Sequence, residues 1–234
     1  MIIRGVEESA GSVEVSVGPD LPGKGGGGER FSLSPGEWKR LNRALGYDPA
    51  AGLFLSPGQP VDEETYDRIR AAHERTAALR DAANLLSYSD RSRSALFRRL
   101  RERGHSPDAA EHAVSFLEKK GVLDDGAACL KYAESAVRSK NVGKRRIVAY
   151  LVSHGFSKED AVRAARSVDP EDYRAALIRR IRKNHPGLTG DPAELDRSQK
   201  QKAIAALLRQ GFSADEIRSA LRDAPWDALP EGED

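Results

Sequence analysis

The chain has 234 residues, of which 39% are hydrophobic, 38 are Lys or Arg and 36 are Asp or Glu, so its formal net charge is only +2. This length suits one large or two small domains, and without a run of about 18 apolar residues we expect no membrane-spanning segment. The first residues, MIIRGVEESA, lack the pattern of a signal peptide, and a single cysteine, Cys129, excludes an internal disulfide framework. These features predict a cytoplasmic protein.

The first part of the chain predicts a small β-rich extension. The Gly-rich loop at 18–28 cannot hold regular structure, and we expect it to be mobile. After it, Ser34 as N-cap, Pro35 at the first helical position and Gly46 as a stop predict a short helix. The strands are predicted from runs rich in β-branched residues at 2–8, 13–17 and 30–33.

Beyond residue 81 the sequence predicts helices almost throughout, and they repeat. Gly104, Gly155 and Gly211 each follow a leucine by four residues and precede a serine by two. Apolar residues then recur six, nine and ten positions after each glycine, which is the spacing of one face of an α-helix. Each unit is therefore predicted to be a helix, a glycine at the structural turn, a serine N-cap and a second helix.

A third helix is predicted before each pair, so a three-helix module occurs three times. We expect a mostly α-helical protein in which three tandem three-helix repeats form an elongated, curved array behind the small β-rich N-terminal extension. The preceding helices are predicted at roughly 64–87, 125–140 and 171–184. The expected segments are the extension at 1–61, the repeats at 62–123, 124–168 and 169–223, and an acidic tail at 224–234.

The small net charge hides an asymmetry along the chain. Residues 1–81 carry 10 basic and 13 acidic groups, residues 82–223 sum to +9, and residues 224–234 carry −4. A basic body between acidic ends favours a polyanion or an acidic protein surface as partner. The alternative is that Arg-rich helices are merely well solvated.

Clustered cations on the repeat helices are the candidate residues for binding a partner or phosphate. Arginines crowd one helix of the first repeat, and three cations occupy the first turn of a second-repeat helix, where they oppose the helix dipole. Such groups can hold phosphates without reading sequence, and because aromatic residues are nearly absent from the clusters, base stacking is disfavoured. The candidates are Arg91, Arg93, Arg98, Arg101, Lys140, Lys144, Arg145, Arg146, Arg182 and Lys183.

No arrangement of residues predicts catalysis. The five histidines lack metal-ligand spacing, and no Ser-His-Asp context is present. Residues 18–24 match the glycine and lysine positions of a phosphate-binding loop, but a glycine stands where the motif needs Ser or Thr. We therefore expect no enzyme, no metal and no cofactor, and an inert, buried thiol at Cys129.

The repeats resemble the bacterial recombination regulator family RecX over roughly residues 62–222. The resemblance is carried by SRSALFRRLRERGHSPDAAEHAVSFLEKKGVLDD at 92–125, GKRRIVAYLVSHGFSKEDAVRAA at 143–165 and LLRQGFSADEIRSAL at 207–221. In two places the chain departs from the family pattern: Ala95 stands where Glu is usual, and Cys129 with Leu130 replaces the common Phe-Ala.

The resemblance implies a non-enzymatic, cytoplasmic modulator of the RecA recombinase. Members of the family bind RecA, lie along the groove of its filament on single-stranded DNA, and usually restrain strand exchange and ATP hydrolysis. The residues by themselves predict a helical repeat protein that binds an extended anionic surface. Two alternatives stay open: a stand-alone DNA-binding protein of helix-turn-helix-like units, and a passive helical scaffold. We expect a monomer, since a linear repeat with polar ends needs no partner copy.

Overall fold

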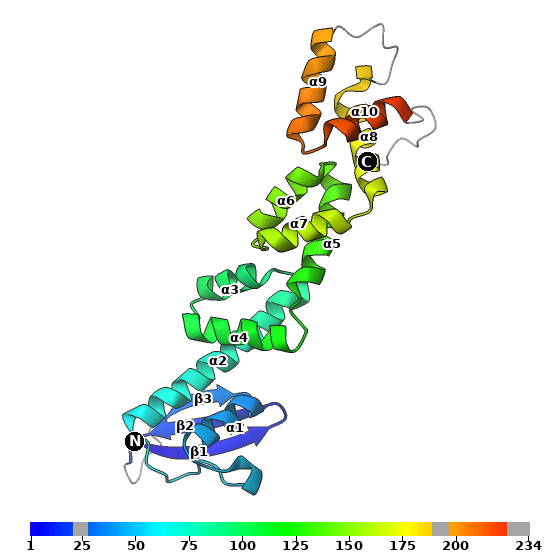
Figure 1. Cartoon of the computed structure of the whole chain (residues 1–234). Coiled ribbons are helices and arrows are strands. Elements are labelled where there is room, and N and C mark those ends of the chain that lie inside the picture. The colour runs from blue at the N-terminus through cyan, green and yellow to red at the C-terminus, as the bar shows by residue number, and fades with distance from the viewer. Residues whose placement is uncertain (21–27, 189–196, 224–234) are drawn as a thin grey trace. The chain divides into compact units, whose positions relative to one another are not determined.

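The computed structural model describes residues 1–20, 28–188 and 197–223. Helices make up most of these residues, and the strands precede residue 34 (Figure 1). This confirms the predicted mostly helical chain with a small β-rich N-terminal extension. Most of the Gly-rich loop and the acidic tail at 224–234 lie outside the described residues.

Two compact units make up the chain. The first contains residues 1–90 and 96–122, and the second contains residues 91–95 and 123–234. The finer boundaries predicted between the extension and the three repeats stay a prediction, as does the elongated, curved array.

The first unit begins with a three-stranded antiparallel sheet whose strands pair in chain order. Val13, Val15 and Val17 of the middle strand are buried, because successive side chains of a strand point to opposite faces. They pack with residues of the first two helices into one hydrophobic core. The strands are β1 (Ile2–Ser9), β2 (Ser12–Gly18) and β3 (Glu29–Leu33).

The helices of the first unit begin where the sequence predicts. Ser34 Oγ accepts a hydrogen bond from the Glu37 N–H at 3.2 Å and caps the first helix, which is followed by Gly46 with a φ of +85°. Asp62 caps the long second helix by accepting from the Thr65 N–H. The helices are α1 (Pro35–Ala44), α2 (Glu63–Tyr88), α3 (Arg93–Glu102, whose first three residues belong to the second unit) and α4 (Pro107–Lys119), with a 3-10 turn at Pro49–Ala51.

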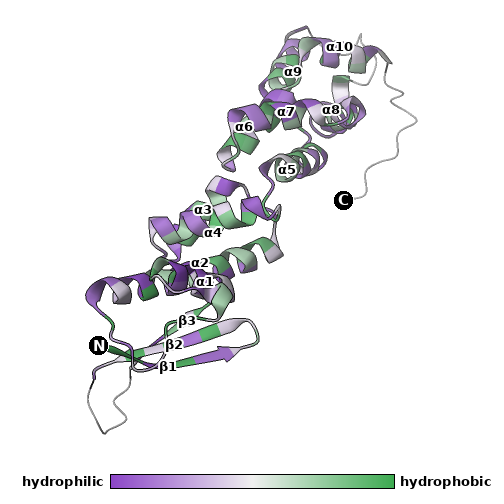
Figure 2. Cartoon of the chain, turned by 60° about the horizontal axis from the view of Figure 1, so that its bottom comes forward, coloured by the Kyte–Doolittle hydropathy of each residue, from purple (hydrophilic) through white to green (hydrophobic). Residues whose placement is uncertain are grey.

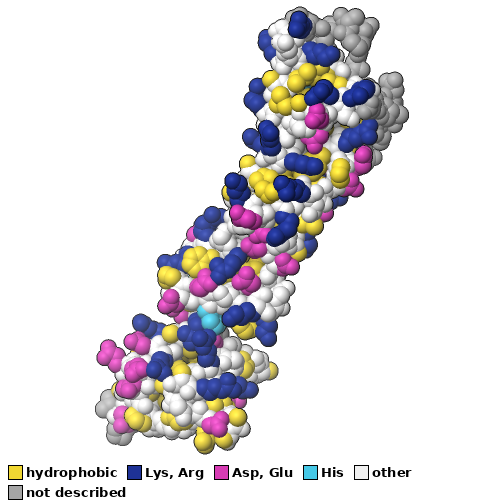
Figure 3. Space-filling model, viewed as in Figure 1, with side chains coloured by type: hydrophobic (Ala, Val, Ile, Leu, Met, Phe, Trp, Pro, Cys, Tyr) yellow, Lys and Arg dark blue, Asp and Glu magenta, His cyan; other side chains and the backbone are white. Residues whose placement is uncertain are grey.

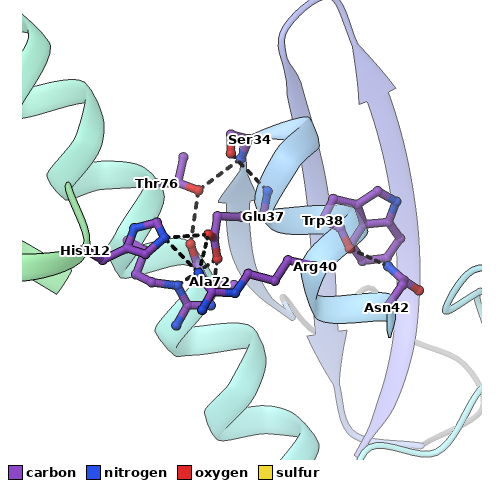
Figure 4. A network of polar contacts seen from close by, with 9 residues as sticks. Ser34, Glu37, Trp38, Arg40, Asn42, Ala72, Thr76 and His112 are labelled. Carbon is purple, nitrogen blue, oxygen red and sulfur yellow. Dashed lines mark hydrogen bonds and ion pairs between the residues drawn. The ribbon is translucent and has the colours of Figure 1, made fainter. Parts of the chain in front are cut away.

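A buried carboxylate joins α1, α2 and α4 (Figure 4). Glu37 is only 6% exposed, and its Oε2 accepts from Arg75 Nε at 2.7 Å and Nη2 at 2.6 Å. Its Oε1 lies 3.3 Å from His112 Nε2 and 3.6 Å from Arg40 Nη1. The buried charge is therefore paired, as its removal from water requires.

The second unit contains the remaining helices, along which hydrophobic and hydrophilic residues alternate (Figure 2). Two hydrophobic clusters form its core, one between the helices around Ile147 and one around Leu207 and Phe212. The helices are α5 (Asp125–Lys140), α6 (Lys144–Ser153), α7 (Lys158–Ser167), α8 (Pro170–Asn184), α9 (Arg197–Arg209) and α10 (Ala214–Asp223), with a 3-10 turn at Pro186–Leu188.

The three glycine turns have the predicted conformation. Gly104, Gly155 and Gly211 have φ values of +93°, +87° and +91°, a left-handed region in which a side chain is strained. The serine two residues after each glycine caps the next helix: the hydroxyl accepts from the backbone N–H three residues on, at 3.0 to 3.3 Å. These contacts confirm the predicted helix, glycine and serine pattern in all three repeats.

Within the second unit, a helix start lies against the glycine turn of the next repeat. The Gly143 N–H, just before α6, donates to the Gln210 carbonyl at 2.9 Å. A Cβ built on Gly143 would stand only 2.3 Å from the backbone of Gly211, so this approach requires glycine. At the corresponding place one repeat earlier, Ser94 Oγ donates to the Gly155 carbonyl at 2.7 Å.

Candidate polyanion interface

The start of α6 carries three cations and no acidic residue in its first turn. Arg145 and Arg146 are exposed to solvent. Neither side chain has an ion pair or hydrogen bond within the described ranges. Lys144 is half-buried, with its Nζ 5.3 Å from the centre of the Tyr173 ring.

The backbone at the start of α6 contributes little to binding an external anion. Gly143 offers no side-chain cap, and the Arg145 N–H points to the Gly211 carbonyl at 3.4 Å. The N-terminal end of the helix dipole therefore faces protein, while Lys144, Arg145 and Arg146 sit where cations are unfavourable by about 0.3–1 kcal/mol each. The side chains, and not the backbone, are the groups available to a partner.

The ends of α5 and α8 add further cations beside the α6 start. Arg179 Nε donates to Asn141 Oδ1 at 2.8 Å, and Arg180 Nη1 donates to the Lys140 carbonyl at 3.3 Å. These contacts bring the end of α8 to the loop between α5 and α6. We call the resulting group the α6 basic cluster, which consists of Lys140, Lys144, Arg145, Arg146, Arg179 and Arg180.

Arg179 and Arg180 were not among the candidates predicted from sequence. Their neighbours Arg182 and Lys183 were, and the structure places these in the last turn of α8, half-buried and exposed respectively. Composition could not distinguish the pairs, because all four lie in one run. The helical period does not distinguish them either, because Arg179 and Lys183 are four positions apart and share a face; only the contacts with Asn141 and the Lys140 carbonyl do.

Two cations of the cluster contact aromatic rings. The expectation that aromatic residues are nearly absent from the clusters is therefore wrong for the folded protein. Lys140 Nζ lies 5.0 Å from the centre of the half-buried Tyr150 ring, and Lys144 Nζ lies over Tyr173. Tyr173 is buried and its hydroxyl donates to the Ala165 carbonyl at 2.8 Å; burial raises the pKa of this phenol. Both rings come from other helices, which is why proximity in sequence missed them. Such contacts hold a cation in place at about 0.5–1 kcal/mol each.

The arginines of α3 have partners of their own. Arg98 and Arg99 lie 4.0 and 2.8 Å from the carboxylate of Glu102. Arg101 donates to the His105 carbonyl, and Arg103 lies 3.8 Å from Asp81. These arginines are therefore held by partners within the first unit, with one carboxylate, Glu102, shared by two of them.

The predicted arginine group around α3 is divided between the two units. Helix α3 begins at Arg93, so Arg91 precedes it, and both residues belong to the second unit, whereas Arg98 and Arg101 belong to the first. The Arg93 N–H donates to Asp125 Oδ1 at 2.7 Å. Arg93, Arg98, Arg99 and Arg101 thus lie on one helix as predicted, Arg91 and Arg103 flank it, and the boundary between the two units falls within it.

Lys and Arg side chains predominate over the C-terminal helices on the face drawn in Figure 3, whereas Asp and Glu are interspersed with them nearer the N-terminus. Within residues 1–20, 28–188 and 197–223, no group of three or more His, Cys, Asp or Glu could hold a metal ion. The same ranges contain no helix long and apolar enough to cross a membrane. Cys129 is fully buried, and burial raises the pKa of its thiol to about 11, so the thiol is protonated and unreactive at neutral pH.

Comparison with known proteins places this chain in a family. A family model described as RecX, first three-helix domain, matches residues 78–117. Regulatory protein RecX of Xanthomonas campestris pv. campestris is 35% identical over 158 residues, which cover 66% of this chain and 91% of that protein. The chain belongs to the RecX family of regulatory proteins.

Further RecX proteins agree in sequence and in fold. Regulatory protein RecX of Stenotrophomonas maltophilia is 33% identical over 163 residues, covering 68% of this chain and 94% of that relative. A crystal structure of regulatory protein RecX superposes with a TM-score of 0.67 at 18% identity, over 93% of this chain and 98% of that one. The structural likeness thus extends further along the chain than the sequence likeness does.

Proposed function

We propose that this RecX-family protein regulates the RecA recombinase, binding RecA and its filament on single-stranded DNA, in the filament groove. Binding would restrain strand exchange and ATP hydrolysis in recombination and DNA repair. The proposal is supported by family membership and by the role that the resemblance implies. We further propose that the protein acts as a monomer in the cytoplasm. A reducing compartment suits a chain whose single cysteine is buried and free.

The observation that carries the proposal is the exposed, unpaired state of Arg145 and Arg146 within the described part of the chain. Both stand at a helix start, where a cation costs stability. A filament on single-stranded DNA offers phosphates along its length, and each cation that meets one releases counterions. Contacts of this kind hold a protein on the backbone without selecting a sequence, which suits a regulator that must bind filaments on any DNA.

Restraint follows from competition for the same surface. A protein that occupies the phosphates or acidic side chains of the groove must be displaced before a second DNA molecule can enter. If it binds the resting filament more tightly than the filament engaged in exchange, it shifts the population toward the resting state. The shift is limited by the difference between the two affinities.

The α7 helix gives little support to the alternative of a stand-alone, sequence-reading DNA-binding protein. In a helix-turn-helix unit the second helix reads base edges with its N-terminal side chains. Here the first turn of α7 carries Glu159 and Asp160, and Asp160 forms an ion pair with Arg163. A gel shift with duplex DNA alone, compared with DNA plus RecA, separates the two functions.

The test is the ATPase activity of RecA on single-stranded DNA with this protein titrated in. We expect the wild type to lower the rate, and Lys144→Glu, Arg145→Glu and Arg146→Glu together to abolish the effect. The matched control replaces Arg98, Arg99 and Arg101 by Glu and should retain most of the effect, because those arginines already have partners. An α6 variant that acts at wild-type concentration would contradict the proposal.

A further inference from the structure

Two helices of the second unit, α6 and α9, carry apolar side chains on an exposed side. Val152 on α6 is 45% exposed, and Leu208 on α9 is 42% exposed. Four residues before them stand Val148 and Ile204, which are half-buried and pack on the hydrophobic clusters beneath. Because residues four apart on a helix share a face, each helix presents an apolar pair along one side. We call these four residues the apolar stripe.

The two pairs occupy the same positions in successive repeats. Val148 and Ile204 stand seven residues before the glycine of their turn, and Val152 and Leu208 stand three residues before it. Single exposed apolar residues are normal on a protein surface, but here packing explains only the inner member of each pair, since the outer member stays exposed in both repeats. In the first repeat the outer position holds Arg101, whose side chain donates to a backbone carbonyl.

The end of α9 and the start of α6 are in contact. The Arg145 N–H donates to the Gly211 carbonyl at 3.4 Å, and both Leu208 and Val148 stand three residues, about one helix turn, from that contact. Figure 3 shows hydrophobic side chains over α6 and α9 on one face, with Lys and Arg side chains around them. The two apolar pairs are therefore neighbouring parts of one surface.

The charged residues of these two helices are all of one sign. Neither α6 nor α9 contains an acidic residue, so the apolar stripe complements a segment that has apolar side chains on one side and carboxylates on the other. A nucleic-acid strand would satisfy the cations but leave the aliphatic side chains without a partner, because bases stack on aromatic rings. The combination thus favours a protein segment. The cations are Lys144, Arg145, Arg146, Arg197, Lys200, Lys202 and Arg209.

We propose that the apolar stripe docks an acidic, amphipathic segment of a protein partner. The apolar side chains of the segment cover Val152 and Leu208 and remove their surface from water, while its carboxylates meet the cations of both helices. The docking follows from the chemistry of α6 and α9 alone. The identity of the partner as the recombinase in its filament rests on the function proposed above.

Fluorescence anisotropy with a labelled synthetic peptide tests the docking without RecA. The probe is a helix-forming peptide of about five turns with Leu on one face and Glu on the other, and its scrambled form lacks the apolar face. We expect the full-length wild type to bind the probe about 10-fold more tightly than the scrambled peptide, and Val152→Ser with Leu208→Ser to remove this difference. The matched control, Leu53→Ser with Val122→Ser, changes residues of the first unit that are 58% and 60% exposed and should keep it.

Equal affinity of the wild type for the two peptides, or wild-type binding of the probe by the Val152 and Leu208 variant, would overturn the docking. An equal loss of affinity for an oligothymidylate in that variant would also overturn it, because the stripe would then belong to a nucleic-acid site. The ATPase activity of RecA on single-stranded DNA identifies the partner: the Leu53 and Val122 control should restrain it and the stripe variant should not. A stripe variant that restrains RecA at wild-type concentration would overturn that identification. If the wild type binds the probe through the stripe but leaves RecA unaffected, the docking stands and the proposed function is contradicted.

Discussion

Helices α3 and α6 occupy the same place in successive repeats and both carry several cations, yet their surroundings differ. On α3, Arg98 and Arg99 face Glu102 and Arg101 is bound to a backbone carbonyl, and just after the helix Arg103 faces Asp81. On α6, Arg145 and Arg146 have no ion pair among the described residues, and the nearby Lys140 and Lys144 rest on aromatic rings. The α3 arginines are held by groups of this chain, whereas Arg145 and Arg146 have no such partner within the described ranges.

The comparison shows that the number of arginines on a helix does not indicate how strongly that helix attracts an anion. Exposed ion pairs such as Arg99 with Glu102 add less than about 1 kcal/mol to stability. They do, however, hold the cation and lower the positive potential that an approaching phosphate would meet. A cation stacked on a ring stays positively charged and is merely held in position.

The largest loss of stability is expected at Gly143, where a close backbone contact with Gly211 fixes the start of α6. Gly143→Val should lower the free energy of unfolding by about 2–3 kcal/mol, because the new side chain meets the Gly211 backbone and must push α6 away from it. Urea unfolding measures the change. Gly104→Ala is the control, since its Cβ meets open space and only the positive φ costs energy, about 1 kcal/mol. Equal costs at the two positions would mean that the contact between Gly143 and Gly211 does not place α6.

A second pair of changes should shift stability in opposite directions. Arg145→Gln with Arg146→Gln removes cations from a helix start and should raise the free energy of unfolding by about 0.5–1 kcal/mol at low ionic strength. Arg99→Gln with Arg101→Gln removes cations from the last turn of α3 and should lower it by a similar amount. Thermal melts at two salt concentrations measure both. Shifts of the same sign would contradict the claim that cations destabilise the start of α6 and stabilise the end of α3.

A smaller, pH-dependent effect is expected in the first unit. Burial, reinforced by Arg40, Arg75 and Lys119 and opposed by Glu37, lowers the pKa of His112 below its usual value near 6.5. Between the folded pKa and 6.5 the unfolded chain binds more protons, so stability is complete above pH 6.5 and falls as the pH drops below it. His112→Gln should flatten the fall in melting temperature between pH 7.5 and 5.5. His185, whose pKa burial also lowers, is not altered by the change and contributes to the slope that remains.

Local features of the fold could be predicted from the sequence because they depend on neighbours along the chain. A glycine at a left-handed turn and a serine capping three residues ahead are decided within one helix turn, and all three repeats have them. The pairing of Arg99 with Glu102 also follows from spacing alone. The candidate site could not be predicted in the same way, because its contacts join residues far apart in the sequence. Arg180 contacts the Lys140 carbonyl 40 residues away, and Lys144 lies over the Tyr173 ring of another helix.

The division of the first arginine group was likewise beyond the sequence. Arg91 and Arg93 are a few residues from Arg98, and composition treats them as one cluster. The structure assigns them to different units, because residues 91–95 pack with the second unit and Arg93 bonds to Asp125. Nothing in the spacing of the arginines marks that change.

The salt dependence of binding to RecA filaments on single-stranded DNA tests most directly the claim that α6, and not α3, presents its charge. The affinities of the wild type, of the Lys144, Arg145 and Arg146 triple glutamate variant, and of the Arg98, Arg99 and Arg101 triple glutamate variant would be measured from low to physiological salt. The account predicts that the α6 variant flattens the slope of log affinity against log salt by about 0.7 for each single-strand phosphate that it no longer binds, while the α3 variant keeps nearly the wild-type slope. An α3 variant that flattens the slope as much as the α6 variant, or an α6 variant with the wild-type slope, would contradict it.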